Sequence, residues 1–156
     1  MRRPGLSRRF LLAGSIASVV VAADLLTKRW AAETFVDAPR EVLGPLLSFT
    51  YTENPGSAFG LISGGGAVFG FAAFVAVGIV IGALLEPRPT AEIVGFGMVA
   101  AGAVGNLVDR IARGPGLLDG TVIDWIQLPN FPVFNLADSS LTVGVALLLI
   151  SAWRSR

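Results

Sequence analysis

The sequence predicts an integral membrane protein, mainly α, with four transmembrane helices and a small extracytoplasmic antiparallel β-sheet. Of its 156 residues, 53% are hydrophobic and only 15% are charged, whereas a soluble domain carries about 25% charged residues. The apolar residues gather in four segments, each close to the roughly 20 residues that cross a hydrocarbon core of about 30 Å as a helix. A further stretch alternates between apolar and polar residues, as a strand with one buried face does.

The four predicted spans cover residues 10–26, 67–85, 91–108 and 137–153. The second contains no charged residue, and each of the others has a polar residue near one end, namely Asp24, Asn106 and Asp138. Because successive helices cross in opposite directions, these three residues are expected at the same membrane surface. The two long connections, 27–66 and 109–136, are expected at that surface as well.

Arginine placement predicts the orientation of the chain. Seven arginines precede the first span, lie in the short second connection or close the chain: Arg2, Arg3, Arg8, Arg9, Arg88, Arg154 and Arg156. Basic residues are enriched in cytoplasmic connections. Both termini are therefore expected in the cytoplasm, and the two long connections outside it.

The N-terminal segment has a second interpretation, an export signal that is later removed. Arg8 and Arg9 resemble the pair of a twin-arginine signal, and residues 21–23 resemble a cleavage site. Against removal, the apolar stretch continues through Leu26. It also contains Asp24, and an ionisable residue inside a membrane segment indicates function.

The first long connection contains a predicted strand. Residues 46–52 alternate strictly, so that Phe49 and its apolar neighbours share one face. Turn residues precede and follow this run. Residues 42–43 and 58–62 are the candidate partner strands, which places the outer β region at about 40–62, on the membrane surface.

The residue types that are missing restrict the chemistry. The chain has no cysteine and no histidine, which excludes a thiolate nucleophile, a Ser-His triad and an imidazole base. Catalysis must then rest on carboxylates, hydroxyls, amides, arginines or the single lysine, Lys28. The net charge of +1, without a basic stripe interleaved with aromatic residues, gives no reason to expect a nucleic-acid partner.

Two groups of polar residues share helical faces. Asp24 and Lys28 lie four residues apart in the order that favours an ion pair, and they form either an interfacial clamp or part of a site. Asn106, Asp109 and Arg110 share one face through their spacing of three and four residues. Arg110 is expected to bond a carboxylate or a substrate carbonyl, or else to extend its side chain to the interface.

Two further acids are candidates for catalysis. Asn135 and Asp138 share a face at the start of the fourth span, where Asn135 suits an N-cap. Asp124 interrupts an apolar and aromatic run, and apolar surroundings raise the pKa of a carboxyl group. Two such acids at a membrane edge indicate an aspartyl dyad, in which one carboxylate takes a proton from water while the other, protonated, polarises the scissile carbonyl.

Three other interpretations remain open at this point. A Ser/Lys peptidase would use Lys28 with Ser57, Ser139 or Ser140 as nucleophile. A small transporter or channel would use the acids to bind protons or ions, but such sites favour the bilayer midplane. A purely structural subunit would leave both candidate acids unexplained.

Small residues four positions apart are expected to pack helices together. Gly78 and Gly82 form a GxxxG pattern in the second span, and Ala101 and Gly105 repeat this spacing in the third. Such pairs let helix backbones approach closely. We expect packing faces there and not binding sites.

Five blocks of the sequence together resemble the lipoprotein signal peptidases, the type II signal peptidases of bacteria (aspartyl peptidase family A8). They are DLLTK at 24–28, NPGSAFG at 54–60, GAVGNLVDR at 102–110, VIDW at 122–125 and FNLAD at 134–138. The blocks follow the family order and extend over nearly the whole chain. The chain departs from the family in Trp125, where phenylalanine is usual, in Ala101, where glycine is frequent, and in a long 111–120 stretch.

The resemblance implies a single membrane-embedded peptidase domain over residues 1–156. It implies an aspartic endopeptidase that removes signal peptides from diacylglyceryl-modified prolipoproteins, cutting before the lipidated cysteine. Asp124 and Asp138 match the catalytic pair, and the remaining candidate site residues are Asn54, Gly56, Asn106, Asp109, Arg110, Asn135, Asp24 and Lys28.

The resemblance also implies where the enzyme works and with what. It implies a multi-pass protein of the bacterial inner, or plasma, membrane, with its active site at the outer face. Lipid-modified prolipoproteins and membrane lipids are the expected partners, and the protein is expected to be a monomer. No metal or organic cofactor is required.

Overall fold

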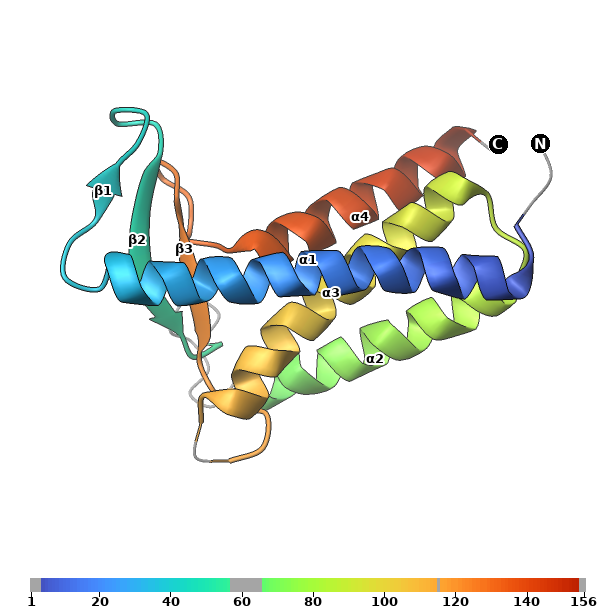
Figure 1. Ribbon diagram of the computed structural model, residues 1–156, viewed down its shortest axis with the longest axis horizontal. Coiled ribbons are helices and arrows are strands. Elements are labelled where there is room, and N and C mark those ends of the chain that lie inside the picture. The colour runs from blue at the N-terminus through green and yellow to red at the C-terminus, as the bar shows by residue number, and fades with distance from the viewer. Residues whose placement is uncertain (1–3, 57–65, 115, 155–156) are drawn as a thin grey trace.

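The structure, a computed structural model, describes residues 4–56, 66–114 and 116–154. Its elements are α1 (Leu6–Thr34), β1 (Arg40–Glu41), β2 (Ser48–Asn54), α2 (Gly66–Leu85), α3 (Thr90–Ala112), β3 (Val122–Gln127) and α4 (Leu136–Arg154). The four helices extend along the long axis of the molecule, the sheet lies across one end, and both termini lie at the other (Figure 1). All four helices are long and apolar enough to cross a membrane, which confirms the predicted fold class.

Helix α1 is longer than predicted. It continues to Thr34, so the segment after residue 26, expected in a connection, is helical. With 29 residues it extends about 43 Å, more than a hydrocarbon core requires. Its last turns pack beneath the sheet, where Ala31 and the following Phe35 are buried. Hydropathy indicates where lipid ends, and it does not indicate where packing against a sheet keeps a helix going.

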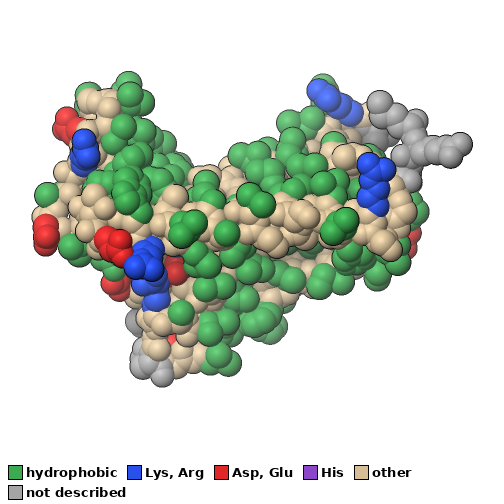
Figure 2. Space-filling view, viewed as in Figure 1, with side chains coloured by type: hydrophobic (Ala, Val, Ile, Leu, Met, Phe, Trp, Pro, Cys, Tyr) green, Lys and Arg blue, Asp and Glu red, His purple; other side chains and the backbone are tan. Residues whose placement is uncertain are grey.

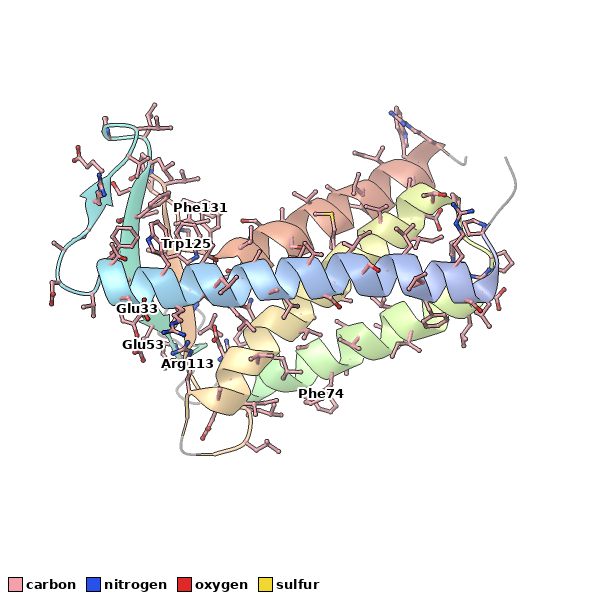
Figure 3. The ribbon with its side chains drawn as sticks, in the orientation of Figure 1. Glu33, Glu53, Phe74, Arg113, Trp125 and Phe131 are labelled. Carbon is pink, nitrogen blue, oxygen red and sulfur yellow. The ribbon has the colours of Figure 1, made fainter. Side chains whose placement is uncertain are left out.

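Helix α3 is the centre of the bundle. It packs most extensively against α4, then against α1 and α2. By contrast, α2 leaves large aromatic side chains exposed, among them Phe71 and Phe74, and Figure 3 shows Phe74 pointing away from the bundle. Apolar side chains cover the helices in the space-filling view, and charged ones gather towards the two ends (Figure 2). This distribution fits helices that face lipid on their outer sides.

The sheet combines strands from both long connections. Its order is β1-β2-β3, antiparallel throughout, with Thr52 opposite Asp124. The predicted partner at 42–43 is wrong, because those residues form the turn and their amides bond to the carbonyl of Leu47. The other predicted partner, at 58–62, lies outside the described residues.

The third strand, β3, is not among the strands predicted from the sequence. Its first four residues are buried. Asp124 interrupts an apolar and aromatic run, but the pairing of that run with β2, about 70 residues earlier in the chain, leaves no local pattern. The sheet therefore joins the two long connections into one layer.

Aromatic side chains fasten this sheet to α1. Trp30 lies edge-on to Phe35, with ring centroids 4.7 Å apart, and to Trp125, at 5.6 Å. Trp125 in turn lies 5.0 Å from Phe49. Phe49 and Tyr51 pack on the same buried cluster, as their alternation predicted. Each such pair adds about 0.5–1.5 kcal/mol beyond its area burial.

The N-terminal segment is part of the bundle at the other end. The buried guanidinium of Arg9 donates to the carbonyl oxygens of Leu84 and Leu85, each at 2.8 Å, and so closes the C-terminal end of α2. Ala13 packs in the core with Ile93. These contacts favour a permanent first helix over a removable signal.

The small-residue pairs behave differently from one another. A Cβ added at Gly105 would lie 2.7 Å from the carboxylate of Asp24, so this glycine permits close packing of α3 and α1. No described residue outside α2 comes within 4 Å of a Cβ built at Gly78 or Gly82. The expectation that this pair packs helices together is therefore not met within the described part of the chain.

We predict that Gly144→Ala lowers the melting temperature of the purified protein in detergent. A Cβ at Gly144 would lie 2.8 Å from the carbonyl oxygen of Gly95 and 2.9 Å from the amide of Val99, and backbone atoms cannot move aside cheaply. Overpacking of this kind costs about 1–3 kcal/mol. Gly78→Ala is the control, expected to be neutral or slightly stabilising because its surroundings are open. Equal melting temperatures for the two variants would contradict this packing.

Candidate functional site

A cavity of about 450 Å³ lies at the sheet end of the bundle. Helices α2, α3 and α4 form its walls, and the ends of β2 and β3 close it. Its polar lining consists of Asn54, Asn106, Arg110, Asp124 and Asp138, and its apolar lining includes Phe69, Ala72, Ala73, Ala76, Leu107 and Leu141. An apolar trough with convergent polar groups at one end is the usual form of a ligand site.

The two candidate catalytic acids meet in this cavity through Asn135. The side-chain amide of Asn135 donates to Oδ1 of Asp124 at 2.7 Å. Its backbone amide donates to Oδ2 of Asp138 at 3.2 Å, while its Oδ1 accepts from the backbone amide of Asp138 at 2.9 Å. The predicted N-cap of α4 is confirmed by this reciprocal pair. One residue thus begins the helix and joins the two acids.

Every carboxyl oxygen of the pair has an N–H donor. Asn54 Nδ2 donates to the second oxygen of Asp124 at 3.0 Å, and Asn106 Nδ2 donates to the second oxygen of Asp138 at 2.7 Å. Together with the two bonds from Asn135, these contacts hold both carboxyl groups in one orientation. Two acids supported by three asparagines therefore share one rigid hydrogen-bonded unit.

Burial raises the pKa of Asp124 from its usual 3.8 to about 6. The side chain lies on β3 and only 2% of the residue is exposed, so the charged form loses most of its hydration. Hydrogen bonds from Asn54 and Asn135 act in the opposite direction, as does the charge of Lys28, while the negative charge of Asp138 raises the pKa further. The predicted upward direction is confirmed. Such a group can hold or release a proton near neutral pH.

Asn54 is held in place by the turn that follows β2. Its Oδ1 accepts from the backbone amide of Gly56 at 2.9 Å, which leaves its Nδ2 directed to Asp124. Gly56 has φ +78°, and a Cβ there would lie 3.0 Å from a guanidinium nitrogen of Arg110. Only glycine fits this turn without strain.

Arg110 is part of the cavity wall. It is 6% exposed, so it does not extend to the interface. Its Nη1 donates to the carbonyl oxygen of Gly120 at 3.1 Å, and its guanidinium lies 5.6 Å from the centre of the Phe69 ring. The bond to Gly120 also ties the loop after α3 back onto the helix. Arg110 is among the residues that line the cavity.

Four of the candidate residues do not line the cavity. Asn135 joins the two acids from behind, and the other three are Asp24, Lys28 and Asp109. Lys28 contacts Asp24 at 2.7 Å and Asp109 at 2.9 Å, and all three side chains are almost completely buried. The i, i+4 ion pair is confirmed, but it is internal and not interfacial. Asp109 departs from the face expected for it, since its second oxygen pairs with Arg113 at 2.9 Å instead of lining the cavity.

The Ser/Lys alternative finds no support in the described residues. Ser139 donates to the carbonyl oxygen of Asn135 and Ser140 to that of Met98, each at 2.9 Å. The ammonium group of Lys28 contacts Asp24, Asp109 and Asn106 instead of a hydroxyl. Ser57 lies outside the described residues.

Two contributors were missed from the sequence. Arg113 lies four residues after Asp109, and that spacing alone could have identified the pair. Phe69, beside Arg110, has no such signal, because its helix is apolar throughout. Over residues 4–56, 66–114 and 116–154, no group of three or more acidic side chains is placed to hold a metal ion.

The fold and the site define a multi-pass membrane protein with a buried pair of carboxyl groups at one end of its helices. A family model described as signal peptidase (SPase) II matches residues 16–154. The chain belongs to the signal peptidase II family and is an aspartic-type peptidase.

Individual relatives agree with this assignment. The lipoprotein signal peptidase of Rhodococcus jostii is 39% identical over 152 residues, which cover 95% of this chain and 75% of the relative. That of Mycobacterium avium is 37% identical over 147 residues, covering 92% and 79%. A solved structure described as a bacterial membrane enzyme superposes with a TM-score of 0.80 at 32% identity, covering 91% of this chain and 87% of the other.

We predict that Asn54→Ala raises the pKa of Asp124 above its value of about 6, because the lost hydrogen bond favours the ionised carboxyl group. The measurement is the carboxyl carbon-13 shift across pH in protein labelled at aspartate, with Asp124→Asn assigning the signal. Glu53→Gln is the control, since its carboxylate bonds to Tyr51 and Thr121 and not to the pair. An unchanged or lower pKa in Asn54→Ala would contradict this account.

Proposed function

We propose that this protein removes the signal peptide from diacylglyceryl-modified prolipoproteins, cutting before the lipidated cysteine, with Asp124 and Asp138 activating the attacking water. The observation that carries the proposal is the pair of carboxyl groups at the polar end of a cavity whose other walls are apolar. The relatives named above are lipoprotein signal peptidases. A substrate with acyl chains beside its scissile bond needs both surfaces at once.

The geometry supports a division of roles between the two acids. Asp124 is the more deeply buried of the two, and burial raises its pKa to about 6, so it donates a proton to the carbonyl oxygen. Asp138 takes a proton from water, whose oxygen attacks the carbonyl carbon. The resulting diol collapses when Asp138 passes its proton to the amide nitrogen, which leaves as the amine, while Asp124 takes back a proton from a diol hydroxyl as the new carboxyl group forms. The four hydrogen bonds from N–H groups to the carboxyl oxygens keep the carboxyl groups in place while protons move.

The cavity walls accommodate the rest of the substrate. Small side chains on one side of α2, Ala72, Ala73 and Ala76, leave room for an extended peptide or an acyl chain. Arg110 presents N–H groups to a peptide carbonyl next to the reacting bond. We propose that the chain acts as a monomer and as one domain.

We further propose that the site lies at the outer face of a bacterial plasma membrane, with both termini in the cytoplasm. The arginine distribution supports this orientation, and the sheet lies at the end of the bundle away from the termini (Figure 1). Asp124 belongs to β3 of that sheet and Asp138 to the first turn of α4. Acids at one surface suit a peptidase, whereas a transporter places them near the midplane.

We expect Asp124→Asn and Asp138→Asn each to reduce cleavage of a synthetic lipidated precursor by at least about a thousandfold, with the protein still folded. Asparagine keeps the shape but cannot exchange the proton that the mechanism needs. Because the pair acts as one unit, the double variant should be scarcely worse than either single one. Wild-type turnover should follow a bell in pH whose limbs belong to the pair.

Controls separate this mechanism from its rivals. Ser57→Ala and Ser139→Ala should retain turnover, because no hydroxyl acts as nucleophile. The aspartyl mechanism is wrong if either serine variant is inactive while Asp138→Asn still cuts. Lower stability of the two aspartate variants with unchanged turnover per folded molecule would assign them a structural role alone.

The proposed topology can be tested with introduced cysteines, because the wild type has none. Leu117→Cys, at an exposed position in the outer loop, should react in intact cells with a thiol reagent that cannot cross the membrane. Glu86→Cys, in the exposed connection after α2, should react only after the cells are opened. The reverse pattern would place the carboxyl pair in the cytoplasm.

A further inference from the structure

Two buried acids outside the cavity each bond to the backbone next to one member of the carboxyl pair. Asp24 Oδ1 accepts from the amide of Ala137 at 2.9 Å, one residue before Asp138. Asp109 Oδ2 accepts from the amide of Ile123 at 3.3 Å, one residue before Asp124. Each member of the pair thus follows a residue whose backbone amide donates to a buried acid, although Asp138 lies in the first turn of a helix and Asp124 in a strand.

Lys28 joins these two acids. Its ammonium group lies 2.7 Å from Asp24 Oδ2 and 2.9 Å from Asp109 Oδ2, and its side chain is completely buried. The same nitrogen donates to Asn106 Oδ1 at 3.0 Å. Because an ammonium group can only donate, the amide nitrogen of Asn106 must face the other way, where it donates to Asp138 at 2.7 Å.

We infer that Lys28 is a positioning residue that sets the spacing of the Asp124–Asp138 pair, by bridging Asp24 and Asp109 and by orienting the amide of Asn106. The inference rests on the proposed function, since it concerns the same carboxyl pair. The charges along the chain of contacts are balanced. Lys28 pairs with Asp24, and Asp109 pairs with Arg113 at the rim.

Lys28 does not line the cavity, so it acts on the reaction through its neighbours and not on the substrate. A displacement of about 1 Å in a reacting group can cost on the order of 100-fold in rate. Loss of the bridge should therefore lower kcat and leave KM almost unchanged. The charge of Lys28 also lowers the pKa of Asp124, so its removal should raise that pKa.

The test is turnover of a lipidated precursor peptide by purified full-length Lys28→Met in detergent, measured across pH. We expect kcat to fall about 10- to 100-fold per folded molecule, KM to stay within about twofold, and the alkaline limb of the pH profile to move to higher pH. Arg29→Met is the matched control. It removes the adjacent cation, which is exposed and pairs with Glu33 on the same helix, and should leave all three quantities unchanged.

A second variant covers the case in which Lys28→Met does not fold. Lys28→Met combined with Asp24→Asn removes one charge of each sign and keeps an oxygen to accept from the amide of Ala137. The same fall in kcat with unchanged KM is expected. A kcat within about twofold of the wild type in either folded variant overturns the inference. The inference is also overturned if activity falls only in proportion to the amount of folded protein and the pH profile does not move. Failure of both variants to fold overturns it as well.

Two failures are distinguishable. If Asp124→Asn and Asp138→Asn still cleave the peptide, the proposed function fails whatever Lys28→Met does. If those variants are inactive while Lys28→Met cleaves with normal kcat, only the positioning role fails.

Discussion

The fully buried ammonium group of Lys28 is the constraint on which the rest of the site depends. A charge inside a protein must find opposite charges and acceptors, because its lost hydration is otherwise uncompensated. Lys28 finds them on its own helix in Asp24 and on α3 in Asp109 and Asn106. The contacts that compensate the charge of Lys28 therefore hold α1 and α3 together and fix their position along each other. It also places the carboxylates of Asp109 and Asp24 where they accept hydrogen bonds from backbone amides of β3 and α4.

Polar groups inside this site are paired in a way that leaves each asparagine only one orientation. The Oδ1 atom of each asparagine accepts a hydrogen bond that fixes its side chain. The donor is the backbone amide of Gly56 for Asn54, the ammonium group of Lys28 for Asn106, and the backbone amide of Asp138 for Asn135. The NH₂ group of each asparagine therefore points to a carboxyl group of the pair and donates to it. A low-dielectric surrounding makes an unpaired polar group costly, so the network resists rearrangement. The same low dielectric raises the pKa of Asp124 and makes it suited to proton transfer.

Local spacing was enough to find most of the site. The i, i+4 pair Asp24–Lys28 and the N-cap at Asn135 are read within one helical turn, and such contacts depend on backbone geometry alone. Spacing could not show which way Asp109 points. Residues three or four positions apart lie on the same side of a helix, but the neighbouring elements determine which of them face the cavity. Asp109 pairs with Lys28 and Arg113, whereas Arg110 faces the cavity. Nor could it show that Ser139 and Ser140 donate to backbone carbonyls.

The sequence by itself determined that this is a four-helix membrane protein whose candidate site residues gather at one end, because hydropathy and alternating crossings are properties of the chain alone. It determined the family too, through five short blocks in order. Only the tertiary structure decided that α1 continues to Thr34 and that β2 pairs with β3. The aromatic contact between Trp30 and Trp125 fastens the end of α1 to the sheet. Pairing across about 70 residues and packing under a sheet leave no periodic trace, since their energy comes from surfaces that meet only after folding.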